Sequence, residues 1–246
     1  MSKRIALVDV DGSKKFPNLA LMKISALHKK RGDTVEWLDL FKDYDIAYKS
    51  KVFTNSPDIN YEIKAAEIRY GGTGYGLGAE YLSDMRYKKL IYLPGHIEES
   101  CPDYSLYPQF KEAYGFLTRG CPRSCEFCIV TRKEGRMSRQ VADIRDFWRN
   151  QKSIKLLDPN LLACIDREKL LKQLAATNSY IDFTQGLDIR LVDLDIIGLL
   201  NSLKVKMLHF AWDNPKEDLT DMFKWFAKHT NVSCVIRAMA TTGQMA

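Results

Sequence analysis

The hydrophobic and polar positions of the first forty residues follow the order strand, helix, strand. A short apolar run from Ile5 to Val10 ends at Asp11-Gly12. After Pro17-Asn18, the apolar positions from Leu19 to Lys30 recur with the period of a helix. Thr34 to Leu38 then alternates like a second strand. This βαβ order predicts a parallel sheet that is covered by helices.

The same domain contains signals for three further strands, near Asp45 to Tyr48, Ile63 to Tyr70 and Lys89 to Leu93. A cluster of glycines from Gly71 to Gly78 follows the second of them. Its spacing does not fit the dinucleotide fingerprint G-x-G-x-x-G. It therefore predicts a turn, or a place where the backbone approaches a neighbour closely.

A connector from Glu98 to Phe110, with two prolines and no clean period, predicts a boundary between a domain at 1–108 and a domain at 109–246. Strand patterns with helical stretches after several of them recur beyond the connector, at Tyr114–Thr118, Ile154–Leu157, Ile181–Phe183, Lys206–Phe210 and Val232–Ile236. Repeated βα units of this length are typical of a (β/α) barrel. The expected fold class is α/β, with an N-terminal Rossmann-like parallel sheet followed by a partial (β/α) barrel.

The composition is that of a folded globular protein, with 246 residues, 46% of them hydrophobic and 28% charged. No run reaches the roughly 20 apolar residues of a membrane span, and the N-terminus lacks a long apolar signal segment, so we expect no membrane association and a cytoplasmic location. The net charge of +6 is compatible with an RNA partner. Solvated surface charge is the alternative, because the basic residues are scattered except at Arg132-Lys133, Arg136 and Arg139.

Three of the six cysteines are clustered as C-x-x-x-C-x-x-C at Cys121, Cys125 and Cys128, directly after a predicted strand. In a reducing compartment such a cluster indicates metal binding or catalysis. Three thiolates can each bond one iron of a [4Fe–4S] cluster and leave the fourth iron open. An open iron can chelate the amino and carboxylate groups of S-adenosylmethionine, and an electron delivered through the cluster can cleave its sulfonium bond.

A zinc site is the competing interpretation of these thiols. It would need a fourth ligand, for which His96, Cys101 and His209 are candidates. The isolated cysteines Cys101, Cys164 and Cys234 are otherwise expected to be small apolar fillers.

With Phe127 before the third cysteine, the motif resembles the C-x-x-x-C-x-aromatic-C signature of the radical S-adenosylmethionine (radical SAM) superfamily. The resemblance implies an enzyme that reductively cleaves S-adenosylmethionine at a [4Fe–4S] cluster, with an external electron donor of the flavodoxin or ferredoxin type and a substrate that these residues do not name. It also implies that Phe127 contacts the adenine of the cofactor. The family's barrel has six βα units, and about five strands can be placed here, so we expect a radical SAM core that is incomplete at the C-terminus or part of a longer protein.

Polar residues at two later strand ends resemble the family's cofactor-binding positions. They are Asp158, Asn160, Gln185, Asp188 and Arg190. Asp213, after the next predicted strand, is a further candidate for the pocket. A guanidinium matches a carboxylate, and a carboxylate or amide suits a ribose diol. A surface ion pair is the alternative for Asp188 and Arg190, and a turn or helix cap is the alternative for Asp213.

Two further resemblances define other hypotheses. The N-terminal domain is similar to cobalamin-binding domains, but neither His28 nor His96 lies in their D-x-H-x-x-G motif. We therefore expect the fold without cobalamin, or at most base-off binding. The residues after Cys128, with Gly135 to Arg139, resemble tRNA methylthiotransferases, although no cysteine before Cys101 could hold their second cluster. A non-catalytic iron–sulfur or zinc module is the third hypothesis.

Overall fold

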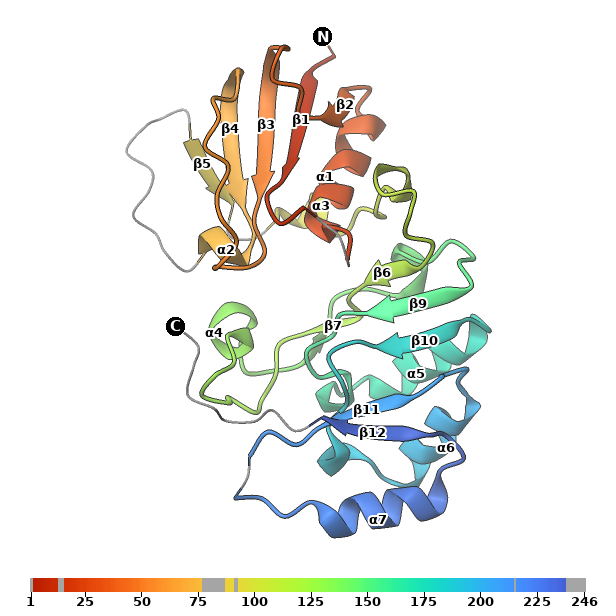
Figure 1. The fold of residues 1–246 in the computed structure, drawn as a ribbon. Helices are drawn as coiled ribbons and strands as arrows, with labels where there is room; N and C mark the ends of the chain where they lie inside the picture. The colour runs from red at the N-terminus through yellow and green to blue at the C-terminus, as the bar shows by residue number, and fades with distance from the viewer. Residues whose placement is uncertain (1, 13–15, 77–86, 91–92, 215, 238–246) are drawn as a thin grey trace. The chain divides into compact units, whose positions relative to one another are not determined.

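Five parallel strands form the sheet of the first of two compact units, residues 1–110 and 111–246 (Figure 1). The computed structural model describes residues 2–12, 16–76, 87–90, 93–214 and 216–237. The strand order is β2-β1-β3-β4-β5. The strands are β1 (Arg4–Asp9), β2 (Thr34–Trp37), β3 (Tyr44–Ser50), β4 (Ala65–Gly71) and β5 (Tyr87–Leu90). The predicted Rossmann-like parallel sheet is confirmed.

Successive side chains of β1 point to opposite faces of the sheet and pack into different clusters. Ile5 and Leu7 pack on one face, in a buried cluster with residues of α1 (Leu19–Lys30), while Ala6 packs on the other face. Full burial of a side chain such as Leu7 contributes about 1.5–3 kcal/mol. The helix has the predicted bounds. Asn18 caps its first turn by accepting from the Leu21 N–H, and the chain leaves it through Gly32 at φ +82°.

The glycines after β4 make the predicted close approach. Gly72 has φ +93°, and a Cβ there would lie 2.3 Å from the Lys51 backbone oxygen. The short helix α2 (Thr73–Gly76) begins next to it, and Gly78 lies outside the described residues. The unit continues with α3 (Gly95–Glu98) and the 3-10 helix η1 (Tyr104–Leu106).

The second unit is a partial (β/α) barrel, in which parallel strands follow one another with α5, α6 and α7 along one side (Figure 1). The parallel strands of this unit form two hydrogen-bonded groups, one of three strands and one of two. A parallel bridge between Leu187 and Phe210 connects the two groups. The strands are β6 (Ala113–Gly115), β9 (Ser153–Leu156), β10 (Tyr180–Phe183), β11 (Leu208–Ala211) and β12 (Cys234–Arg237). The helices are α5 (Arg167–Ala176), α6 (Leu194–Ser202) and α7 (Thr220–His229), with 3-10 turns η2 (Ile144–Asp146), η3 (Leu161–Ala163) and η4 (Ile189–Leu191). None of the helices described here is long and apolar enough to cross a membrane.

The strand predicted at Tyr114–Thr118 is divided in two. β6 ends at Gly115, and β7 (Thr118–Arg119) pairs antiparallel with β8 (Arg139–Gln140). The reason is that the backbone N–H groups of Leu117 and Thr118 donate to the Asp158 carboxylate. The chain therefore leaves the parallel sheet just before the cysteine motif.

Candidate functional site

The cysteine motif lies in a loop that β7 and β8 close at its base. The chain enters it through Gly120, at φ +89°, where a Cβ would lie 2.2 Å from the Met137 backbone oxygen. The Cys121 N–H donates to the Gly135 oxygen over 3.2 Å, and the Cys128 N–H donates to the Cys125 oxygen over 3.0 Å. The short helix α4 (Val130–Glu134) returns the chain to β8. The sequence can fold this way because glycine tolerates a positive φ and this close approach.

The three thiols of this loop are free and half-buried. Burial raises the pKa of the Cys125 thiol, and the nearby Cys128, Asp213 and Cys121 raise it further, against the lowering effect of Arg190. As the side chains stand, no three His, Cys, Asp or Glu in the part of the chain that the structure describes are grouped to hold a single metal ion. A cluster requires a different arrangement, since each thiolate bonds a separate iron.

Asp158, which follows β9, is buried and bonded to the backbone that leads to the loop. Its carboxylate accepts from the N–H groups of Leu117 and Thr118 and from the Thr118 hydroxyl, at 3.1, 2.5 and 2.7 Å. Burial raises the pKa of Asp158 to about 6, although these hydrogen bonds oppose the shift. The structure therefore places this candidate where it holds the entry to the cysteine loop.

Asn160 lies beside the first cysteine and has an unused acceptor. Its side chain is 4% exposed, and its Nδ2 lies 3.7 Å from the Cys121 sulfur and 3.5 Å from Asp188 Oδ2. Its Oδ1 is buried and has no hydrogen-bond partner in the part of the chain that the structure describes. A buried acceptor without a donor costs about 1–3 kcal/mol, so this atom is suited to a ligand that brings a donor.

Asp188 connects the cysteine loop to the residues after β10. Arg123, between the first two cysteines, donates from Nε to Asp188 Oδ2 over 2.5 Å, and Arg190 donates from Nε to Oδ1 over 2.6 Å. Arg190 also pairs with Glu217. Both arginines hold the pKa of the buried Asp188 carboxyl below its usual value, against the effect of burial, which is the largest single contribution. Asp188 and Arg190 thus form an ion pair, as the alternative predicted. The alternative placed this pair at the surface, whereas the Asp188 carboxylate is buried.

The structure shows fewer contacts for the remaining predicted site residues. Asp213, after β11, lies close enough to Cys125 to raise its pKa. Gln185 and Phe127 are exposed, Phe127 to 41%. Sequence reasoning missed Arg123 and Glu217. A charged residue inside the cysteine motif was the available signal for Arg123, and no comparable signal pointed to Glu217.

Structure comparison reveals a similar architecture in a known enzyme. Two structures of the radical S-adenosylmethionine methyltransferase TsrM from Kitasatospora setae match 97% and 96% of this chain and 67% of theirs, with TM-scores of 0.69 and 0.68 and sequence identities of 9% and 10%. The chain has the TsrM fold. One of these structures contains cobalamin and a [4Fe–4S] cluster, and the other contains tryptophan substrate and a SAM analogue. No protein-family model and no curated protein matches the sequence.

The residues of the loop fit the cluster found in TsrM. Three free thiols form a donor set of soft ligands, and Gly120 allows the tight entry of the loop. The Asn160 amide lies next to Cys121 through its Nδ2, and its buried Oδ1 has no donor among the described residues. The chemistry of the donor set is thus compatible with an iron–sulfur cluster.

His28 of the first unit is not available as a ligand for cobalamin, because both of its ring nitrogens have partners. His28 is buried in α1, with its two ring nitrogens bonded to Asp33 and Tyr48 over 2.6 and 2.9 Å. Ligands of open parallel sheets bind at the carboxyl ends of strands where the strand order reverses, here between β1 and β3. At that point the Asn18 amide donates to the Ser50 hydroxyl over 2.9 Å, and the Asp11 carboxylate accepts from the Val52 N–H over 2.6 Å.

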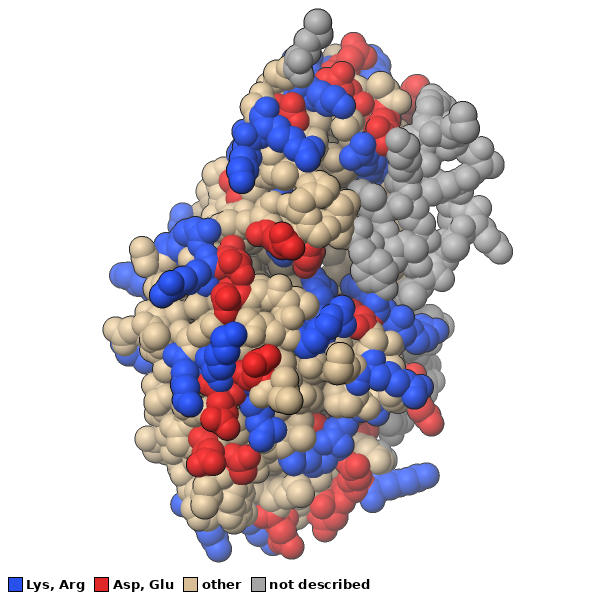
Figure 2. Space-filling view, turned by 180° about the vertical axis from the view of Figure 1, so that it is seen from behind, with Lys and Arg blue, Asp and Glu red and all other residues tan. Residues whose placement is uncertain are grey.

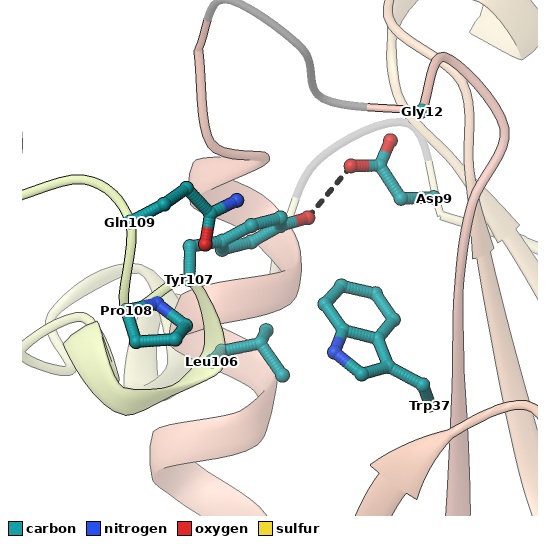
Figure 3. Close-up of a pocket in the computed structure, with 7 residues that line it drawn as sticks. All are labelled: Asp9, Gly12, Trp37, Leu106, Tyr107, Pro108 and Gln109. Atoms are coloured by element: carbon teal, nitrogen blue, oxygen red, sulfur yellow. Dashed lines mark hydrogen bonds between the residues drawn. The ribbon is translucent and has the colours of Figure 1, made fainter.

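A cavity of about 380 Å³ lies beside this point, at the ends of β1 and β2 (Figure 3). Asp9 accepts a hydrogen bond there from the hydroxyl of Tyr107 over 2.7 Å, and the ring of Trp37 packs edge-on against Tyr107. No histidine is among the residues that line it, which are Asp9, Gly12, Trp37, Leu106, Tyr107, Pro108 and Gln109.

Proposed function

We propose that the protein is a radical SAM enzyme that binds a [4Fe–4S] cluster through Cys121, Cys125 and Cys128 and cleaves S-adenosylmethionine reductively. The observation that carries the proposal is the position of the three-thiol loop beside the buried Asn160, whose Nδ2 lies 3.7 Å from the Cys121 sulfur and whose Oδ1 has no hydrogen-bond partner among the described residues. The cluster, when bound, would supply the electron that breaks the sulfonium bond. The TsrM fold supports the same class of chemistry.

The chain's own residues bind and orient the cofactor in this proposal. We assign Asn160 to the amino group of S-adenosylmethionine, because its amide lies beside Cys121 and its Oδ1 is a buried acceptor without a donor among the described residues. Phe127 contacts the adenine by its resemblance to the family motif. Asp213 and Gln185 contribute polar groups to the ribose, since both follow the carboxyl ends of strands.

Asp158, Asp188 and Arg190 serve mainly to position the loop. Asp158 holds the backbone at Leu117 and Thr118, and Asp188 holds Arg123 within the motif. Arg190 is paired with Asp188 and Glu217, so it can reach a cofactor carboxylate only with its remaining N–H groups. We do not extend the methyl transfer named for TsrM to this chain, because a similarity at 9% and 10% sequence identity concerns the fold and not the reaction.

The proposal is tested by the products of cofactor cleavage. The protein is reconstituted anaerobically with iron and sulfide, mixed with S-adenosylmethionine and dithionite, and assayed for 5′-deoxyadenosine and methionine. We expect both products from the wild type and neither from Cys125→Ala. A cluster that forms without either product would identify a non-catalytic iron–sulfur module, and bound zinc without iron would identify the zinc alternative.

A further inference from the structure

The surplus positive charge of the chain is concentrated around the cysteine loop. Residues 119–155 contain ten Lys and Arg against four Asp and Glu, whereas the rest of the sequence contains 27 of each. This one stretch therefore accounts for the whole net charge of +6. A local charge of one sign steers an oppositely charged partner toward it.

Part of this charge lies directly against the first cysteine. The Cys121 N–H donates to the Gly135 oxygen, and Gly120 is packed against the Met137 oxygen. The turn that carries Arg136 and Met137 therefore borders the start of the thiol motif. Arg132, one turn earlier on α4, and Arg139, on β8, flank it. We call these four residues, Arg132, Arg136, Met137 and Arg139, the Arg132–Arg139 surface.

The three arginines of this surface are not neutralised. All three are exposed, and none forms an ion pair with a carboxylate among the residues that the structure describes. Glu134, the acidic residue nearest in sequence, is committed to the Arg119 guanidinium over 2.9 Å and to the Gly120 N–H over 3.2 Å. Glu126 is the other acidic residue of the loop and is exposed.

An apolar side chain accompanies the charge. Met137, within this surface, is 68% exposed. Arginine, methionine and aromatic residues are the types enriched at protein–protein interfaces. A surface this small suits the transient contacts of redox partners, which bury less than about 1,200 Å².

Nucleic acid fits these observations less well. A nucleic-acid site makes on the order of 6–10 phosphate contacts and needs an extended basic track. Outside residues 119–155 the charges balance, and basic and acidic side chains are interspersed over the face drawn in Figure 2. The surface offers three arginines that have no carboxylate partner among the described residues, next to the first cysteine of the motif.

We propose that the Arg132–Arg139 surface is the docking site of an acidic one-electron donor protein, an inference that rests on the proposed function. One electron passes from the reduced donor to the cluster. The donor is oxidised, the cluster is reduced by one electron, and no bond or proton is exchanged. Docking beside Cys121 keeps the electron's path short.

The test compares charge reversal on this surface with charge reversal elsewhere in the same stretch. The variant is Arg132→Glu/Arg136→Glu/Arg139→Glu. The matched control is Arg145→Glu/Arg149→Glu/Lys152→Glu, three residues that are also exposed and without a carboxylate partner among the described residues, but lie beyond β8. Stopped-flow measurements follow reduction of the cluster in the full chain by an acidic flavodoxin hydroquinone, or by reduced methyl viologen, a small cation that needs no docking surface.

We expect the flavodoxin rate constant to fall at least tenfold in the variant and to lose most of its dependence on salt. The control triple should stay within about twofold of the wild type, and viologen, as a cation, should reduce both triple variants at least as fast as the wild type. An unchanged flavodoxin rate in the variant, or an equal fall in both triples, would overturn the docking site. Salt-dependent binding of a labelled RNA that only the variant loses, with an unchanged flavodoxin rate, would assign the surface to RNA. If viologen-reduced wild type makes no 5′-deoxyadenosine, the proposed function itself fails, whatever the flavodoxin result.

Discussion

The Nε of Arg123 donates to Oδ2 of Asp188 over 2.5 Å, so the loop that carries the three cysteines is bound to the loop after β10. Arg123 lies between Cys121 and Cys125, and Asp188 is 5% exposed. A buried carboxylate shared by two arginines is a strong restraint, because loss of either partner leaves an unpaired charge.

Replacing Asp188 with Asn should therefore loosen the cysteine loop. The substitution removes the negative charge and replaces one acceptor oxygen by an NH2 donor, so the guanidinium that faced this oxygen loses its partner. We expect the free energy of unfolding to fall by about 2–4 kcal/mol, and the iron retained after reconstitution and desalting to fall with it. Urea unfolding and iron analysis measure the two effects. Asp182→Asn is the control, because Asp182 lies on β10 and has no side-chain partner among the residues that the structure describes, and equal behaviour of the two variants would refute the restraint.

Asp158 should make stability depend on pH. Burial raises its folded-state pKa to about 6, above the value near 3.8 in the unfolded chain. The folded state thus binds more protons between these values, and the stability that this provides is complete below pH 3.8 and lost as the pH rises through 6. We expect the free energy of unfolding of the wild type, relative to Asp158→Asn, to fall by about 2 kcal/mol between pH 4 and pH 7. A difference that does not vary with pH would mean that the hydrogen bonds from Leu117 and Thr118 outweigh burial.

Substitution by alanine should destabilise the protein to different extents at Gly120 and Gly135, two glycines of the cysteine loop. Both have a positive φ, +89° at Gly120 and +95° at Gly135, so each substitution costs about 1–2 kcal/mol in backbone strain. A Cβ at Gly120 would also collide with the Met137 oxygen, whereas nothing lies within 4 Å of one at Gly135. We expect Gly120→Ala to destabilise the protein by at least 2 kcal/mol more than Gly135→Ala in urea unfolding. Equal losses would show that the loop entry is not closely packed.

Substitution of Asn160 should weaken cofactor binding but change the stability of the protein little. The Oδ1 of Asn160 has no partner among the described residues and its Nδ2 contacts are long, so Asn160→Ala should change the free energy of unfolding by less than about 1 kcal/mol. Binding of S-adenosylmethionine to the reconstituted protein, measured by calorimetry, should weaken at least tenfold. Asn214→Ala, an exposed asparagine after β11, should bind as the wild type does. Unchanged affinity in Asn160→Ala would remove Asn160 from the cofactor site.

Local patterns in the sequence predicted most of the fold. The bounds of α1 follow from the Asn18 cap and Gly32, and the strands of both units follow from apolar runs that end in polar residues. The break after β6 could not be predicted, because it depends on Asp158, some 40 residues further along the chain. A contact of this kind leaves no periodic signal in the strand that it interrupts.

The candidate site was predicted at the level of strand ends, but the partners of its residues were not. Because parallel strands end at the same edge, Asn160, Asp188 and the cysteine loop were expected together. Whether Arg190 faces a cofactor or Asp188 depends on side-chain geometry. The structure pairs it with Asp188 and with Glu217, a residue that sequence reasoning did not select.

The central claim is tested most directly by electron paramagnetic resonance of the reduced, reconstituted protein with and without S-adenosylmethionine. We predict a [4Fe–4S] signal that changes when S-adenosylmethionine is added, since an open iron would bind it, and no signal from any of Cys121→Ala, Cys125→Ala and Cys128→Ala. A cluster signal that S-adenosylmethionine leaves unchanged, or full iron content in all three cysteine variants, would contradict the account.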